Sequence, residues 1–242
     1  MKLQRISCVG ANEKLAVGDC VDFLARNPRA ELGVGVSKQK GGAGTARNKW
    51  LGELLDEHRG GRVPLHVNND WSVGVANNRY PEELIDFLKT KPASKMQVNL
   101  GGCGYTSKDI EVKKFIASVV RADELGSRLI LSYNPEFAAI IKNIYESVGD
   151  KFDVLYDASF GYGKRADKYE SVFPNLVQGY AGGLSPDNIA EQLDKIASAQ
   201  PSGRLVRVFI DAEGGLRSDN KNVIDLNKAE QFVYNAIEWE RG

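Results

Sequence analysis

The sequence predicts a single (β/α)8 barrel that spans residues 1–242, and three observations support this fold class. Eight short segments rich in valine, isoleucine and leucine alternate with segments of helical pattern. Apolar runs of this kind are typical of parallel strands buried on both faces. A length of 242 residues suits eight strand–helix units. No linker or low-complexity tract divides the chain, and a doubly wound sheet would use fewer strands or show a clear switch point.

The predicted elements follow from these alternating patterns in chain order. The strands are expected at residues 3–9, 31–36, 63–67, 96–100, 128–132, 153–157, 176–180 and 206–211. The helices are expected at residues 18–26, 47–58, 81–88, 108–125, 135–148, 164–171, 186–199 and 226–239. Pro81, Pro135 and Pro186 fall in predicted first turns, where proline is tolerated. Asn134 and Ser185 precede two of them as predicted N-caps.

Composition excludes several classes of function. Lysine plus arginine and aspartate plus glutamate both number 32, so no net charge attracts nucleic acid or an anionic membrane. No apolar run is long enough to span a bilayer. The three cysteines lack CxxC spacing and the two histidines are too few for a histidine-rich site, so no metal is expected. Free cysteines favour a cytoplasmic protein, and a monomer and a homodimer are both compatible with the sequence.

Two glycine pairs predict a phosphate site. The segment QGYAGGLSPDNIAEQL ends the seventh predicted strand at Gly182 and Gly183 and then enters a helix. The eighth predicted strand is followed by Gly214 and Gly215. Phosphate binds after strands seven and eight in many barrels, where glycines and a helix N-terminus expose N–H groups. The alternative is that these glycines only form tight turns.

Candidate catalytic residues stand at the ends of other predicted strands. Cys8 closes the first strand as a thiolate base or, alternatively, as a small buried apolar group. Asp157 closes the sixth strand as a general acid or base, or as an acceptor for the N–H groups of the turn at Gly161 and Gly163. Asp211 closes the eighth strand and is equally compatible with a catalytic or a structural role.

Further polar residues are expected on the same face of the barrel. Gln97 and Asn99 lie in the fourth predicted strand, and Asn68 follows the third; uncharged polar groups suit sugar hydroxyls. His66 is interpreted as a core histidine, because no partner stands at metal-ligand spacing. Residues 37–49, which include Arg47, form a polar, glycine-rich stretch that is expected to be a long loop at the mouth.

The segment YAGGLSPDNI resembles the LAGGLNPENV element of the phosphoribosylanthranilate isomerases, which are phosphate-binding (β/α)8 barrels. In that family the first strand carries a cysteine general base, which corresponds to Cys8, and the sixth carries an aspartate general acid, which corresponds to Asp157. The resemblance further places Gln97, Asn99 and Asp211 at the ligand. Other matching positions are Arg47 in Thr45-Ala46-Arg47, and Asp225 and Lys228 near the C-terminus.

The resemblance implies an Amadori rearrangement of a phosphorylated aminosugar without a cofactor. Asp157 would open the sugar ring, and Cys8 would remove a proton from its second carbon. Glu213 and Arg217 depart from the family pattern at the phosphate side. Two alternatives therefore stay open. One is another phosphosugar-binding barrel enzyme of the epimerase or lyase type, and the other is a non-catalytic barrel that binds a phosphorylated ligand.

Overall fold

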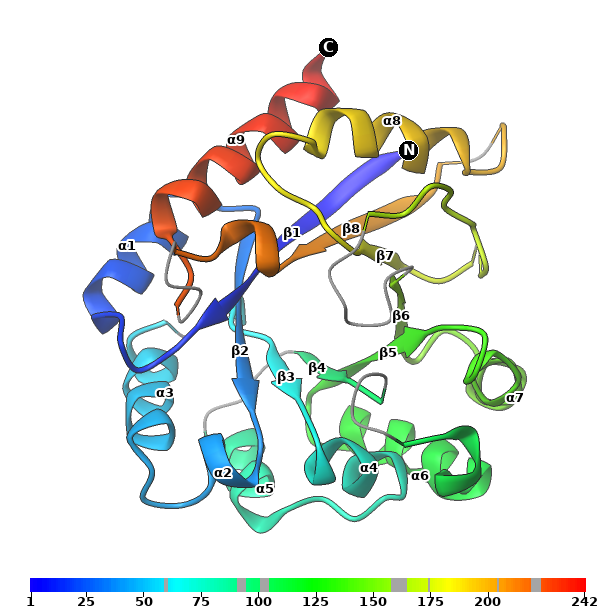
Figure 1. Ribbon diagram of the computed structural model, residues 1–242. Helices are drawn as coiled ribbons and strands as arrows, with labels where there is room; N and C mark the ends of the chain where they lie inside the picture. The colour runs from blue at the N-terminus through cyan, green and yellow to red at the C-terminus, as the bar shows by residue number, and fades with distance from the viewer. Residues whose placement is uncertain are drawn as a thin grey trace.

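The computed structural model shows a closed barrel of parallel strands in the order β1 to β8, with β8 pairing with β1 (Figure 1). It describes residues 1–58, 61–90, 95–100, 105–157, 165–173, 175–203, 205–218 and 223–242. The predicted (β/α)8 fold is therefore confirmed. The strands are β1 Lys2–Ala11, β2 Ala30–Val36, β3 Leu65–Val67, β4 Lys95–Val98, β5 Arg128–Tyr133, β6 Asp153–Asp157, β7 Gln178–Ala181 and β8 Arg207–Ala212.

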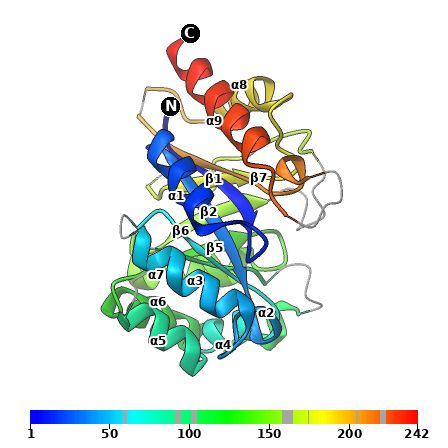
Figure 2. The same ribbon diagram turned by 90° about the vertical axis from the view of Figure 1, so that its left-hand side faces the viewer.

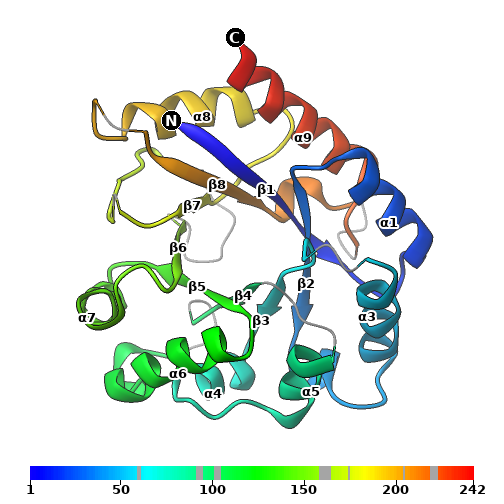
Figure 3. The same cartoon turned by 180° about the vertical axis from the view of Figure 1, so that it is seen from behind.

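Helices cover the outside of the barrel, and neighbouring helices pack side by side, as α1 does with α3 and α8 with α9 (Figures 2 and 3). Their apolar faces meet the outward side chains of the strands in one large core. The helices are α1 Val17–Arg26, α2 Lys38–Gly41, α3 Ala46–Glu57, α4 Asp70–Ala76, α5 Glu82–Thr90, α6 Val112–Glu124, α7 Ala138–Val148, α8 Ile189–Ser198 and α9 Leu226–Arg241.

The connection between β6 and β7 differs from the prediction. A helix was expected at residues 164–171, but the described residues 165–173 of this connection contain no helix. The buried side chain of Gln178 instead binds the end of this connection, because its oxygen accepts the N–H of Val172 at 2.9 Å and its amide donates to the carbonyl of Glu170 at 2.6 Å. These bonds hold the end of this connection against the start of β7.

The polar stretch at residues 37–49 is more ordered than the sequence suggests. The prediction of one long loop is wrong, because α2 and the start of α3 both fall within it. Thr45 caps α3, where its hydroxyl oxygen accepts the N–H of Asn48 at 3.1 Å. Gly41 packs against Trp71, and a Cβ at Gly41 would lie 3.3 Å from that ring. α4 was not predicted, and it supplies Trp71 to this contact.

A buried network of charges fills the N-terminal end of the barrel interior. Arg5 contacts Asp153 at 2.6 Å and Glu31 at 3.5 Å, and Arg128 contacts the second oxygen of Asp153 at 2.7 Å. Lys95 pairs with Glu31 as well. These residues stand at or near the beginning of their strands. Because buried charges are stable only when paired, the network is a structural plug that leaves the opposite end of the barrel for function.

An apolar layer lies above this plug. The guanidinium of Arg5 lies 4.1 Å from the ring centroid of Phe209, which belongs to a small cluster with Ile130, Leu155, Val177 and Ala181. Phe209 also fills the space beside Gly179, where any Cβ would collide with its ring. The interior is therefore closed below the C-terminal mouth.

Candidate functional site

A polar layer of inward-facing side chains lies at the C-terminal mouth of the barrel. Side chains alternate along a strand, so a residue two positions after an inward-facing one also faces the interior. Ser132 follows Ile130 of the apolar layer in this way, and Asp211 follows Phe209. The amide of Gln97 donates to Asn99 Oδ1 at 2.9 Å, and the hydroxyl of Ser132 donates to the same oxygen at 3.2 Å. The amide of Asn99 donates to Asn68 Oδ1 at 2.9 Å. Three neighbouring strand ends thus hold one network of uncharged polar groups.

Asp211 faces this layer from β8, and the pKa of its carboxyl is raised. The residue is only 8% exposed. Burial raises the pKa of Asp211 from 3.8 to about 7, and the negative charges of Glu213, Asp157 and Glu31 act in the same direction. A carboxyl with a pKa near neutrality can both accept and return a proton, which is the property that general acid–base catalysis needs.

His66 lies beside Asp211, with 4.0 Å between His66 Nε2 and Asp211 Oδ1. Burial lowers the pKa of His66 to about 4, so its imidazole is neutral at physiological pH. A Cβ at Gly33 would lie 2.7 Å from His66 Nε2, so the glycine makes room for the ring. No partner for this histidine could be predicted, because Asp211 lies 145 positions away along the chain. Only its alternation with Asn68 hints that both side chains face inward.

Cys8 does not join this layer. Arg5 and Ser7 lie on the inward face of β1, where Ser7 is in register with Asp211, so the side chain of Cys8 points toward the helices. Cys8 is fully buried in the outer core. Burial, together with the charges of Asp211 and Glu31, raises the pKa of its thiol far above the usual value. This position matches the small, buried apolar role and offers no thiolate to a ligand at the mouth.

Asp157 ends β6 and is half-buried. Its charge contributes to the raised pKa of Asp211, so the two carboxyl groups interact across the mouth. The turn at Gly161 and Gly163, which was expected to contact Asp157, lies outside the described residues.

The loops after β7 and β8, which carry the two glycine pairs, are in contact. Gly182 and Gly183 have φ values of 103° and 62°, in the region that favours glycine. A Cβ at Gly215 would lie 2.7 Å from the Cβ of Ser185, so the glycine permits the close approach. Asn188, rather than the predicted Ser185, makes the side-chain bonds before α8, since it accepts the Ser185 N–H at 3.0 Å and donates to the Gly183 carbonyl at 2.8 Å.

Arg217, after β8, and Arg47, at the start of α3, each form an ion pair with a glutamate. Glu213 forms an ion pair with Arg217, and the guanidinium of Arg217 offsets the negative charge of Glu213. Arg47 donates to the carbonyl of Gly35 at 2.9 Å and pairs with Glu13. Arg47 therefore ties α3 to the end of β2 and to the loop after β1, where a phosphosugar would have to compete with Glu13 for it.

A small polar pocket of about 280 Å³ adjoins the mouth beyond β2, β3 and β4. Its lining includes Ser37, Lys38, Asn69, Asp70 and Tyr105. The Ser37 hydroxyl is buried and makes no hydrogen bond within the described part of the chain. In the whole described part of the chain, there is no group of three or more His, Cys, Asp or Glu side chains placed to hold a metal ion. No helix in this described part is both long and apolar enough to cross a membrane.

No protein-family model matches the chain, and no curated protein is similar to it in sequence. Solved structures with a similar fold include the YdjI aldolase from Escherichia coli K12, with a TM-score of 0.50 and 13% identity over 99% of this chain and 90% of that chain. A citrate lyase from Burkholderia xenovorans LB400 gives 0.50 and 10% over 98% and 78%. Ribulose-1,5-bisphosphate carboxylase/oxygenase from Pyrococcus horikoshii OT3 gives 0.53 and 10% over 98% and 59%. These identities show the barrel fold alone.

Proposed function

We propose that this chain is an enzyme of the epimerase or lyase type that moves a proton next to the carbonyl group of a small phosphorylated sugar. The buried carboxyl of Asp211, whose pKa lies near neutrality at the mouth of the barrel, carries the proposal. Among the proteins with a similar fold are an aldolase, a lyase and an enzyme named for a phosphorylated sugar. The shared fold with these enzymes supports the epimerase or lyase class without defining the substrate.

In the proposed reaction, ionised Asp211 removes a proton from the carbon beside the carbonyl. The C–H electrons move toward the carbonyl oxygen and form an enediolate. In an epimerase a second acid, for which Asp157 is the candidate, gives a proton to the opposite face of the same carbon. In a lyase that works in the direction of synthesis, the enediolate carbon instead forms a bond to the carbonyl carbon of a second molecule, whose oxygen takes up the proton. His66 is a positioning residue, because its neutral ring lies against Asp211 and adds no positive charge that would lower the pKa of the carboxyl.

The polar network provides the proposed binding surface for the sugar. The amides of Asn68, Asn99 and Gln97 and the Ser132 hydroxyl can exchange hydrogen bonds with hydroxyl and carbonyl oxygens without introducing charge. The proposed phosphate site is the pair of contacting loops at Gly182, Gly183, Gly214 and Gly215. The catalytic step as written needs no cofactor.

The Amadori rearrangement of phosphoribosylanthranilate isomerases is a second candidate, favoured by the glycine turn at the end of β7. Because Cys8 faces the helices, this candidate would have to use Asp211 as the base in place of the thiol, with Asp157 as the acid. A barrel that only binds a phosphorylated ligand would need neither group.

Hydrogen–deuterium exchange tests the proposal before the product is known. The protein is incubated in D2O with ribulose 5-phosphate, fructose 6-phosphate and ribose 5-phosphate, and loss of C–H signals is followed by proton NMR. Exchange is expected with at least one phosphosugar, and Asp211→Asn is expected to reduce its rate by roughly 10²-fold or more. Asp22→Asn, at an exposed position of α1, is the matched control.

Each other outcome has a defined meaning. Exchange that persists in Asp211→Asn would remove the proposed base. Thermal stabilisation by a phosphosugar without exchange would favour the binding barrel, because a ligand at a hundredfold excess over its dissociation constant stabilises by about 2.7 kcal/mol. Neither exchange nor stabilisation with any phosphosugar would overturn the proposal.

A further inference from the structure

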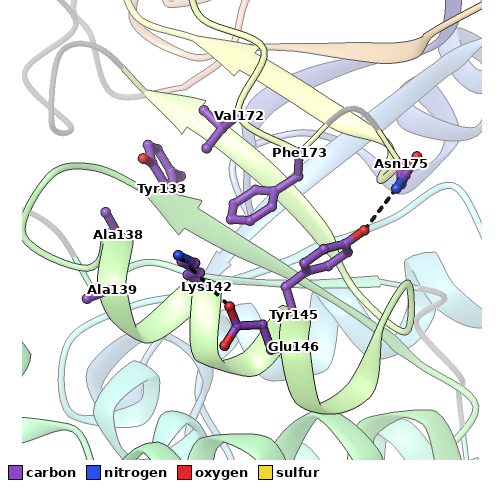
Figure 4. Close-up of a pocket in the computed structure, with 9 residues that line it drawn as sticks. All are labelled: Tyr133, Ala138, Ala139, Lys142, Tyr145, Glu146, Val172, Phe173 and Asn175. Carbon is purple, nitrogen blue, oxygen red and sulfur yellow. Dashed lines mark hydrogen bonds and ion pairs between the residues drawn. The ribbon is translucent and has the colours of Figure 1, made fainter.

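A second pocket, of about 530 Å³, lies outside the barrel, beside the β6–β7 connection that lacks the predicted helix (Figure 4). Its walls come from the end of β5, one side of α7 and the residues Val172, Phe173 and Asn175. Tyr133 belongs to this pocket, whereas its neighbour Ser132 faces the barrel interior. Because successive side chains of a strand point to opposite faces, the pocket is separate from the candidate site at the mouth.

The pocket presents aromatic surface to a ligand. The rings of Tyr133 and Phe173 meet edge to face, with centroids 6.0 Å apart and an interplanar angle of 83°. Tyr145 tilts against Phe173 at 5.2 Å, and its hydroxyl accepts a hydrogen bond from the Asn175 amide at 3.1 Å. These contacts hold the rings in place, and the ring of Tyr133 also stacks on Tyr156 with centroids 6.2 Å apart. Tyr133 and Tyr145 are half-buried and line the pocket together with Phe173, and such an aromatic lining favours a flat apolar group. The volume lies within the range of roughly 300–1,000 Å³ that is typical of small-molecule sites.

Opposite charges stand at the edge of this aromatic surface. Lys142 and Glu146 lie one turn apart on α7, and 4.0 Å separates Lys142 Nζ from Glu146 Oε1 (Figure 4). Their side chains are 70% and 59% exposed, so their mutual attraction is weak and both can turn to a ligand. A molecule that carries an ammonium and a carboxylate on the same carbon atom could pair with both side chains at once.

The geometry points to an aromatic amino acid as the class of ligand for this pocket. The ring would lie against Tyr133 and Phe173, the carboxylate toward Lys142 and the ammonium toward Glu146. The volume is that of one small molecule rather than of a peptide or a protein segment. This inference is independent of the proposed reaction, because it concerns a different surface and binding alone.

NMR titration of the isotopically labelled protein with L-phenylalanine tests the inference. Saturable shifts are expected in the amide signals of α7 and of Val172, Phe173 and Asn175. Phenethylamine lacks the carboxylate and 3-phenylpropionate lacks the ammonium, so each is expected to bind roughly two- to fivefold more weakly, the value of one exposed ion pair. Glycine, which has both charges and no ring, is expected not to bind.

Two pairs of variants separate binding from folding. Ala138→Trp fills the pocket and is expected to abolish the shifts, whereas Ala197→Trp, at a half-buried alanine of α8, is expected to leave them. If Ala138→Trp does not fold, Ala139→Trp replaces it, because Ala139 is exposed and also lines the pocket. Lys142→Ala is expected to weaken binding two- to fivefold, and Lys195→Ala, from the Glu191–Lys195 pair of α8, is its control.

Some results would overturn the inference. They are the absence of shifts with L-phenylalanine at millimolar concentration, shifts that survive in the filled variant, and equal binding of L-phenylalanine and glycine. Tighter binding of either one-charge analogue would likewise exclude the paired recognition by Lys142 and Glu146.

Discussion

Replacing Asp211 with asparagine is expected to stabilise the protein while it removes the proposed activity. The pKa of this carboxyl rises from 3.8 to about 7 on folding, chiefly through burial. A raised pKa means that the folded state resists ionisation. The contribution of Asp211 to stability is therefore fully present below pH 3.8 and is lost as the pH rises toward 7. Asparagine has nearly the same shape and never ionises, so the variant escapes this loss.

The magnitude follows from the size of the rise. Each tenfold change in proton affinity corresponds to 1.36 kcal/mol, so a rise from 3.8 to about 7 gives an upper value of about 4 kcal/mol above pH 7. The two proteins are expected to have similar free energies of unfolding near pH 4. The difference should grow between pH 4 and pH 7 and then remain constant.

Urea unfolding at a series of pH values measures this difference. His66 has the opposite dependence, because its pKa falls from 6.5 to about 4, and its contribution is lost as the pH decreases through that range. His66 is present in both proteins, so its effect largely cancels in the comparison. A difference that does not change with pH, or a variant less stable than the parent at pH 8, would refute the reasoning about Asp211.

Three further substitutions test other parts of the structure. Cys8→Ala is expected to lower the free energy of unfolding by about 1 kcal/mol while phosphosugar exchange continues; loss of exchange in a folded variant would restore Cys8 as the base. Asp153→Asn leaves the buried Arg5 charge without its closest partner and should cost about 3–5 kcal/mol in urea unfolding, so a change below 1 kcal/mol would contradict a structural plug. Gly179→Ala forces a methyl group into the ring of Phe209 and should lower the melting temperature by an amount equivalent to about 1–3 kcal/mol; an unchanged melting temperature would contradict this packing.

The sequence was sufficient to predict the barrel and the face on which polar groups gather. Runs of valine, isoleucine and leucine mark strands that are buried on both faces, and this signal is local. The helical pattern at residues 164–171 was misleading, and the structure shows instead that Gln178 of β7 binds the backbone of Glu170 and Val172 in this connection. Asn68, Asn99 and Asp211 were expected on one face because they stand at or just beyond strand ends, and the structure brings them there.

Closure of the barrel, and not the sequence pattern, sets which of these residues face the interior and what their chemistry is. A strand buried on both sides has no polar alternation, so the sequence could not show that Ser7 faces inward and Cys8 faces the helices. The pKa values of Asp211 and His66 depend on burial and on charges from other strands, which meet only when the barrel closes. The chain order of apolar segments thus determined the fold, while closure of the barrel determined the site.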